Sequence, residues 1–225
     1  MPENKNAAIW FVDRHIEEGR GANTAFREAD GQRRSQTYAE LAKRSDLVAG
    51  AFASAGLRRE DRVACLILDQ LEYPEIFWGA LKAGVVPVAL NTLLATSVYQ
   101  SVLNDSRATC LIVSVELWEI VAPALTENKD LRKVIVIGAN TPSGVMSYKE
   151  FLAPAEVKRA IYATDDECAF WLYSSGSTGQ PKGVRHVHSA LRSTAETYGA
   201  QVLGIKENDI IFSAAKIFFA YGMGL

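Results

Sequence analysis

The hydrophobic residues of this chain follow two spacings, one typical of strands and one typical of helices. Short apolar runs rich in Val, Ile and Leu predict buried strands over residues 63–68, 85–89, 109–113, 133–137 and 168–173. Between them, apolar residues at every third or fourth position predict helices over residues 7–17, 37–56, 74–83, 96–104, 115–125 and 148–152. Because buried β-branched strands that alternate with helices are typical of parallel sheets, we predict an α/β fold with largely parallel sheets flanked by helices.

Local signals predict where two of these helices begin. Thr37 is followed three residues later by Glu40, which is the pattern of a capping box. Thr96 or Ser97 is expected to cap the helix that follows the second strand. Gly, Asn, Pro and Ser gather at the start of residues 138–164, which we interpret as a connection within one domain, with a domain boundary near residue 160 as the alternative.

Residues 173–183 read YSSGSTGQPKG and carry the most informative chemistry of the chain. Glycines let the backbone approach a ligand closely, and successive free N–H groups form a concave anion site. Hydroxyl groups add further donors, and Lys182 supplies a compact positive charge. The segment therefore predicts a loop that binds polyphosphate. Its predicted binding residues are Ser174, Ser175, Gly176, Ser177, Thr178, Gly179, Lys182 and Gly183.

The spacing of this loop differs from the common phosphate-binding fingerprints. A Walker A loop has its lysine directly after a glycine and before Ser or Thr, whereas Lys182 follows Pro181 and precedes Gly183. The glycines also do not read G-x-G-x-x-G, the Rossmann pattern. A flexible Ser/Gly linker is the alternative interpretation. The apolar run over residues 169–173 and Val184 lie on either side, which favours a loop held between buried segments.

The string SSGSTGQPKG resembles the phosphate-loop signature of the adenylate-forming enzymes, a superfamily of acyl- and aryl-CoA ligases, peptide-synthetase adenylation domains and luciferases. Residues 212–224 are similar to one branch, the benzoate–CoA and 4-hydroxybenzoate–CoA ligases. The resemblance extends over residues 1–225. It implies the first part of the large N-terminal AMP-binding (adenylation) domain, with the remaining C-terminal part and a small lid domain absent from this chain.

This resemblance implies ATP-dependent ligation of an aromatic carboxylic acid, of the benzoate or 4-hydroxybenzoate type, to coenzyme A. The reaction passes through an acyl-adenylate and releases AMP and pyrophosphate, with ATP, Mg²⁺ and coenzyme A as cofactors and co-substrates. Lys182 is the predicted catalytic residue, because a fixed positive charge stabilises pyrophosphate as it departs. The family's magnesium-binding glutamate, ribose-binding aspartate and adenylation lysine have no counterpart here, so we expect the isolated chain to be inactive.

Residues 218–222 read Phe-Phe-Ala-Tyr-Gly and place three aromatic side chains within four positions. An aromatic-walled slot suits a flat ring, since aromatic rings stack or meet edge to face. The resemblance assigns Phe219, Ala220, Tyr221 and Gly222 to the pocket for the carboxylic acid. The alternative is that these aromatics belong to the ordinary core.

His186 and His188 form an H-x-H pair that would face the same way on a strand. A zinc site needs three or four ligands, and the only other histidine, His15, is far upstream, so we predict no metal site. We expect the pair to lie near the nucleotide or to shape the turn after the loop. The cysteines lie in or beside apolar runs without CxxC spacing, which is typical of reduced, buried thiols. They are Cys65, Cys110 and Cys168.

Composition narrows the remaining classes of function. The 225 residues include 24 basic and 26 acidic side chains, and this balance argues against nucleic-acid binding. No apolar run approaches the length of a membrane span, and the polar start shows no signal peptide, so we predict a cytoplasmic protein. The expected partners are an aromatic carboxylate, ATP and CoA. The alternatives are an acyl-CoA ligase or amino-acid adenylation domain of another substrate class, or a short non-catalytic nucleotide-binding protein.

Overall fold

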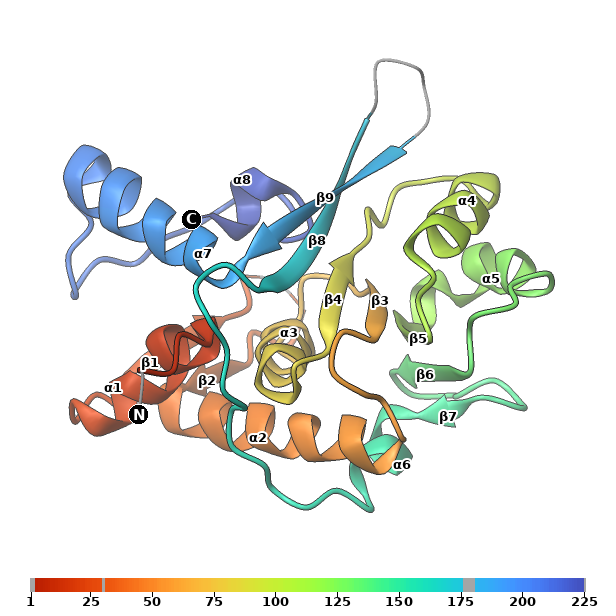
Figure 1. The fold of residues 1–225 in the computed structure, drawn as a ribbon, viewed down its shortest axis with the longest axis horizontal. Coiled ribbons are helices and arrows are strands. Elements are labelled where there is room, and N and C mark those ends of the chain that lie inside the picture. Colours follow the sequence, from red (N-terminus) through yellow and green to blue (C-terminus); the bar gives the residue numbers. More distant parts are fainter. Residues whose placement is uncertain (1–2, 30, 176–180, 225) are drawn as a thin grey trace.

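A seven-stranded sheet runs through the centre of the computed structural model, which describes residues 3–29, 31–175 and 181–224 (Figure 1). In sheet order its strands are β7 (Met146–Ser147), β6 (Lys133–Ile137), β5 (Cys110–Ser114), β3 (Arg62–Leu66), β4 (Val86–Ala89), β8 (Cys168–Ser175) and β9 (Pro181–Val187). Neighbouring strands are parallel except β8 and β9, which are antiparallel. The predicted α/β class with a largely parallel sheet is confirmed.

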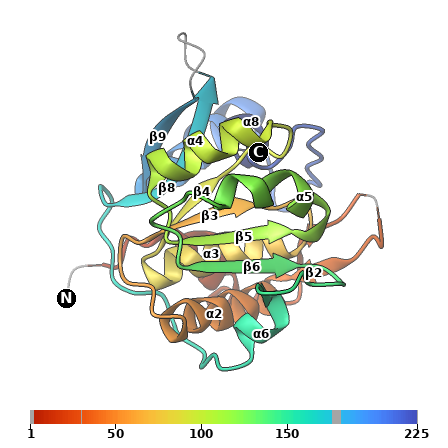
Figure 2. The same ribbon diagram turned by 90° about the vertical axis from the view of Figure 1, so that its right-hand side faces the viewer.

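Helices cover both faces of this sheet (Figure 2). One face carries α2 (Tyr38–Ser54), α3 (Glu72–Ala83) and α6 (Tyr148–Leu152), and the other carries α4 (Thr96–Ser106) and α5 (Trp118–Val121). Shorter elements are η1 (Ile9–Asp13), α1 (Arg14–Glu17), β1 (Thr24–Arg27), β2 (Ser35–Thr37), η2 (Val115–Leu117), η3 (Ala122–Leu125), α7 (His188–Thr194), η4 (Ala195–Leu203) and α8 (Ala220–Met223). No described helix combines the length and the apolar character that a membrane span requires.

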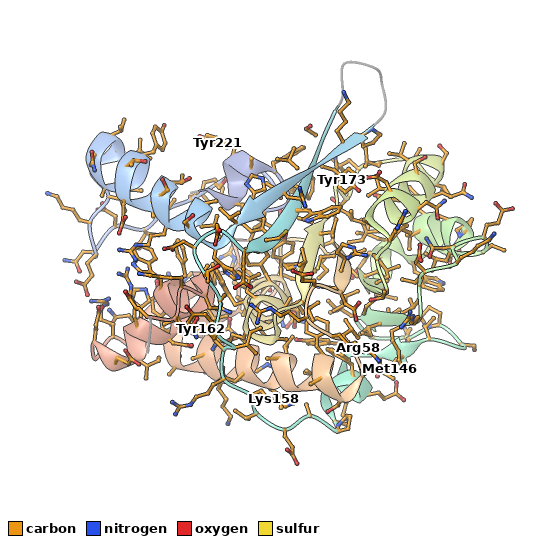
Figure 3. All side chains as sticks on the ribbon, in the orientation of Figure 1. Arg58, Met146, Lys158, Tyr162, Tyr173 and Tyr221 are labelled. Carbon is orange, nitrogen blue, oxygen red and sulfur yellow. The ribbon has the colours of Figure 1, made fainter. Side chains whose placement is uncertain are left out.

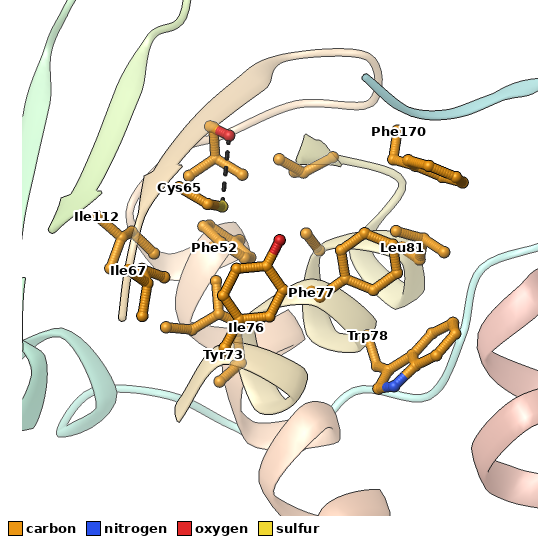
Figure 4. Close-up of a cluster of buried hydrophobic side chains, with 14 of the residues drawn as sticks. Phe52, Cys65, Ile67, Tyr73, Ile76, Phe77, Trp78, Leu81, Ile112 and Phe170 are labelled. Carbon is orange, nitrogen blue, oxygen red and sulfur yellow. Dashed lines mark hydrogen bonds between the residues drawn. The ribbon is translucent and has the colours of Figure 1, made fainter. Parts of the chain in front are cut away.

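The two faces of the sheet form two separate hydrophobic clusters because side chains alternate along each strand. In β3, Val63 and Cys65 pack toward α3, whereas Ala64 and Leu66 pack toward α4. Figure 4 shows the first cluster, in which Phe77 meets Phe170 edge to face at 5.4 Å between ring centroids. This contact ties α3 to β8, the strand that leads into the phosphate loop.

The ammonium group of Lys82 lies inside the helical layer of the first cluster. The Lys82 side chain of α3 is fully buried, and its Nζ lies 2.6 Å from Asp13 Oδ1 and 2.5 Å from Asp46 Oδ1. These aspartates belong to η1 and α2. The ammonium group therefore links three helical segments whose apolar faces already pack together.

The capping prediction for α2 is confirmed, whereas that for α4 is wrong. The Thr37 hydroxyl accepts a hydrogen bond from the Glu40 N–H at 3.2 Å, and the Glu40 carboxylate accepts one from the Thr37 N–H at 2.8 Å. Helix α4 starts at Thr96 with Ala95 at its cap position, without a side-chain cap. The Thr96 hydroxyl instead donates to the carbonyl of Ile120 at 2.8 Å, so tertiary contact replaces the expected cap.

Other differences concern short or interrupted elements. The helix expected over 115–125 is divided into η2, α5 and η3, and a proline stands in the first turn of η3, where it cannot donate a backbone hydrogen bond. The hairpin of β1 and β2 was not predicted, because its strands are short and offer no buried apolar run. Strand β9 was also not predicted, since its sequence contains Pro181 and Gly183 and its side chains are mostly exposed.

Candidate active site

The predicted phosphate loop connects β8 to β9 at the carboxyl end of β8 (Figure 1). Strand β8 pairs in parallel with β4, and its Phe170 and Leu172 side chains belong to the first core cluster. In open α/β sheets, ligands bind beside the carboxyl ends of the strands. The fold therefore places Ser174 and Lys182, at the described ends of the loop, where such sheets bind ligands. Four predicted site residues lie outside the described part of the chain: Gly176, Ser177, Thr178 and Gly179.

The described residues on either side of the loop lie directly opposite one another. Ser174 of β8 pairs with Lys182 of β9, and both side chains are exposed, while Ser175 pairs with Pro181. The antiparallel ladder thus brings the predicted catalytic lysine and a predicted hydroxyl donor to the same end of the hairpin. Their roles stay predictions.

The packing of the hairpin leaves little room for a side chain at Gly183. It pairs with Tyr173, and a Cβ atom built at Gly183 would lie 3.2 Å from Tyr173 Cζ and 3.3 Å from Trp171 Cε3. Directly opposed residues of an antiparallel pair share one face of the sheet. Without a side chain at Gly183, the Tyr173 ring can lie across β9. Gly183 therefore fits a packing role at the base of the loop.

The Tyr173 hydroxyl donates a hydrogen bond of 2.5 Å to Asp105 Oδ2 on α4. Burial and this hydrogen bond both raise the pKa of Tyr173, so the phenol stays protonated and donates at neutral pH. Sequence analysis did not identify Asp105, and it included Tyr173 in the loop segment without giving it a role. A carboxylate near the end of α4 gives no local signal of its contact with β8. Figure 3 shows Tyr173 beside the hairpin and Tyr221 at α8.

The predicted acid-pocket residues lie around α8. Phe218, just before them, is 4% exposed and packs in the first cluster, whereas Phe219 and Tyr221 are 44% and 68% exposed. Ala220 is also exposed, and Gly222 is half-buried. Core packing thus accounts for Phe218 but not for Phe219 or Tyr221. The side chains of Phe219, Ala220 and Tyr221 are thus exposed around α8.

Gly222 is enforced by a close backbone approach. A Cβ atom at this position would lie 2.3 Å from the carbonyl oxygen of Lys216 and 2.8 Å from that of Ala215. Any side chain would therefore push α8 away from the preceding turn. This close approach fixes Phe219, Ala220 and Tyr221 relative to the segment before them.

Asp69, which follows β3, holds the same segment to the sheet. Its Oδ1 accepts a hydrogen bond from the Ile217 N–H at 3.1 Å, and its Oδ2 lies 2.9 Å from Lys216 Nζ. Lys216 therefore pairs with a carboxylate at the carboxyl end of the strands. Sequence analysis missed Asp69, which is 148 residues from Ile217 along the chain.

The two histidines of the H-x-H pair do not act together. The His186 ring stacks on Phe170 at 4.6 Å, whereas His188 Nδ1 accepts a hydrogen bond from the Ala7 N–H at 3.1 Å. Burial lowers the pKa of both imidazoles, which favours their neutral forms. No group of His, Cys, Asp and Glu among the described residues is arranged to hold a metal ion.

The surroundings of the three cysteines fit packing roles. Two are fully buried, and burial raises the pKa of Cys65 to about 12 and also raises the pKa of Cys110. Cys168 is half-buried, and its Sγ accepts a hydrogen bond of 3.2 Å from the Trp171 indole.

A cavity of about 420 Å³ lies beside α2, and none of the predicted site residues lines it.

The fold and the phosphate-loop hairpin agree with a family match over residues 13–225 to the AMP-binding enzymes. The chain belongs to the family of AMP-binding enzymes. Among relatives, it is 44% identical over 227 residues to a benzoate–CoA ligase of Thauera aromatica, covering 100% of this chain and 42% of the relative. It is 43% identical to a 4-hydroxybenzoate–CoA/benzoate–CoA ligase of Rhodopseudomonas palustris, covering 97% of this chain and 40% of the relative.

Solved structures give the same result. The anthranilate CoA ligase AuaEII in complex with anthranoyl-AMP matches with a TM-score of 0.92 and 31% identity, over 100% of this chain and 42% of that one. A benzoate CoA ligase from Burkholderia xenovorans LB400 matches with a TM-score of 0.84 and 39% identity, over 99% of this chain and 42% of that one. The chain therefore spans less than half the length of the relatives it matches.

Proposed function

We propose that this chain carries the phosphate-binding part of an ATP-dependent ligase that joins an aromatic carboxylic acid, benzoate or 4-hydroxybenzoate, to coenzyme A. The observation that carries the proposal is the SSGSTGQPKG loop at the carboxyl end of β8, within a chain 44% identical to a benzoate–CoA ligase. Residues 1–225 would form part of the N-terminal AMP-binding domain, with the rest of that domain and the small lid domain outside this chain. A cytoplasmic location is part of the same proposal.

The chemistry explains why such a loop is needed. A carboxylate resists attack by a thiol because it is negatively charged and has no good leaving group. Attack of the carboxylate oxygen on the α-phosphorus of ATP forms an acyl-adenylate and breaks the bond to pyrophosphate. The CoA thiolate then attacks the acyl carbon and displaces AMP, which gives the thioester. Positioning and charge neutralisation dominate such phosphoryl chemistry.

The residues of this chain would supply the phosphate side of that reaction. The serine and threonine hydroxyls and the backbone N–H groups of residues 174–183 would hold the β- and γ-phosphates. Lys182, exposed at the base of the loop, would stabilise pyrophosphate as its negative charge develops. Phe219, Ala220, Tyr221 and Gly222 would contact the aromatic acid. Mg²⁺ enters the proposal together with ATP, whose phosphate oxygens it binds in phosphoryl-transfer enzymes.

The proposal is tested on the complete product of the native open reading frame. Purified protein is given ATP, Mg²⁺ and CoA with benzoate, 4-hydroxybenzoate, hexanoate or an amino acid, and AMP release is measured. We expect the aromatic acids to support release far better than hexanoate or amino acids. Preference for hexanoate or an amino acid would replace the aromatic substrate by another class. Absence of AMP release with all acids would refute the ligase.

A further inference from the structure

The base of the phosphate-loop hairpin has a side-chain connection to the opposite layer of the fold. Side chains alternate along β8, so Phe170 and Leu172 pack toward α3, whereas Trp171 and Tyr173 pack toward α4. The Tyr173 hydroxyl therefore meets α4, where it donates to Asp105 at 2.5 Å. Among residues 168–174 and 181–187, Tyr173 alone makes a side-chain hydrogen bond to a described residue outside the hairpin.

We propose that the hydrogen bond between Tyr173 and Asp105 holds Ser174 and Lys182, the described residues at the two ends of the predicted loop, in place for ATP and so strengthens ATP binding. This inference rests on the proposed function. Tyr173 immediately precedes residues 174–183, and its partner in the ladder, Gly183, is the last residue of that segment. A fixed Tyr173 ring, lying across Gly183, therefore fixes the points at which both ends of the loop leave the sheet. Tyr173 is a positioning residue that acts through Ser174 and Lys182.

The β9 side chains beside the loop contribute little packing. Strand β9 is at the edge of the sheet, and its side chains from Lys182 to Arg185 are exposed. The Tyr173 phenol, by contrast, stays protonated because burial and the carboxylate raise its pKa, so the bond persists across the physiological pH range. The base of the loop is therefore fixed from the α4 side.

The expected effect is modest because Asp105 is exposed to solvent. A hydrogen bond of this kind contributes on the order of 1 kcal/mol, which corresponds to a change of about fivefold in an equilibrium constant. Tyr173→Phe removes only the hydroxyl, and Asp105→Ala removes only the acceptor. We expect each variant to raise the Kd for ATP about fivefold and the double variant to raise it no further, since both changes remove one bond.

The test uses the complete native gene product and measures the Kd for ATP by equilibrium dialysis, together with KM for ATP and for benzoate. Tyr148→Phe is the matched control, because its phenol also donates to a carboxylate, Glu75, at 3.1 Å, but lies on α6. Only Tyr173→Phe, Asp105→Ala and their double variant should weaken ATP binding. KM for benzoate should stay within about twofold in all variants.

Several results would overturn the inference. These are an unchanged Kd in Tyr173→Phe, additive effects in the double variant, or an equal loss in Tyr148→Phe. A parallel rise of KM for both substrates would likewise indicate general damage to the fold. Wild-type protein that binds ATP but forms no benzoyl-CoA would refute the proposed function and leave the binding test intact. Wild-type protein that does not bind ATP would refute both.

Discussion

Gly222→Ala is the sharpest test of the proposed acid pocket. The added Cβ atom would lie 2.3 Å from the carbonyl oxygen of Lys216, about 1 Å closer than an ordinary contact. The nearest atoms, the carbonyl oxygens of Lys216 and Ala215, belong to the backbone and cannot rotate away. Helix α8 must therefore shift by about that distance relative to residues 215–216. A misplacement of about 1 Å near reacting groups costs roughly 10²-fold in rate. We therefore expect kcat/KM for benzoate to fall about 100-fold.

Gly199→Ala is the matched control, because a Cβ atom there meets its nearest neighbours at 3.9 Å. Both variants are assayed in the complete gene product by benzoyl-CoA formation, with the thermal midpoint and the Kd for ATP measured alongside. The control should keep full activity, and Gly222→Ala should keep its affinity for ATP. Gly222→Ala protein with normal kcat/KM for benzoate would refute the placement of the acid pocket around α8.

Two further predictions concern stability. Burial lowers the pKa of His188 and His186 below the value of about 6.5 in the unfolded chain. The unfolded state therefore binds more protons, and the free energy of unfolding falls as the pH drops from about 7 toward 5. His188→Asn, which keeps an acceptor for the Ala7 N–H, should show a shallower fall in thermal midpoint; an unchanged slope would contradict this. Lys82→Met leaves two aspartates without their partner and should cost about 3 kcal/mol in urea unfolding, and wild-type stability in that variant would contradict the ion pair's role.

The sequence predicted those parts of the fold whose signals are local. The capping box of Thr37 and Glu40 and the apolar runs of β5 and β6 depend on neighbouring residues, and the structure confirms them. Strand β9 could not be predicted in the same way. Its extended conformation comes from pairing with β8, although its own residues include Pro181 and Gly183.

In the candidate site, too, residues with a local sequence signal were predicted and residues brought together by the fold were not. The predicted phosphate loop is one continuous string, so a phosphate-binding role can be predicted from the sequence alone. Asp105 and Asp69 could not be found, because each is brought to its partner by the sheet topology. Asp105 is 68 residues from Tyr173, and Asp69 is 148 residues from Ile217. Single carboxylates that follow a strand or stand near the end of a helix are common on protein surfaces.

Exchange of labelled pyrophosphate into ATP tests the central claim most directly, because the exchange requires reversible formation of an acyl-adenylate. In the complete gene product we expect exchange that depends on benzoate and proceeds without CoA. Lys182→Ala should lower it by about 10²-fold or more, whereas Lys206→Ala, at an exposed lysine after η4, should not. No benzoate-dependent exchange in wild-type protein, or full exchange in folded Lys182→Ala protein, would contradict the account.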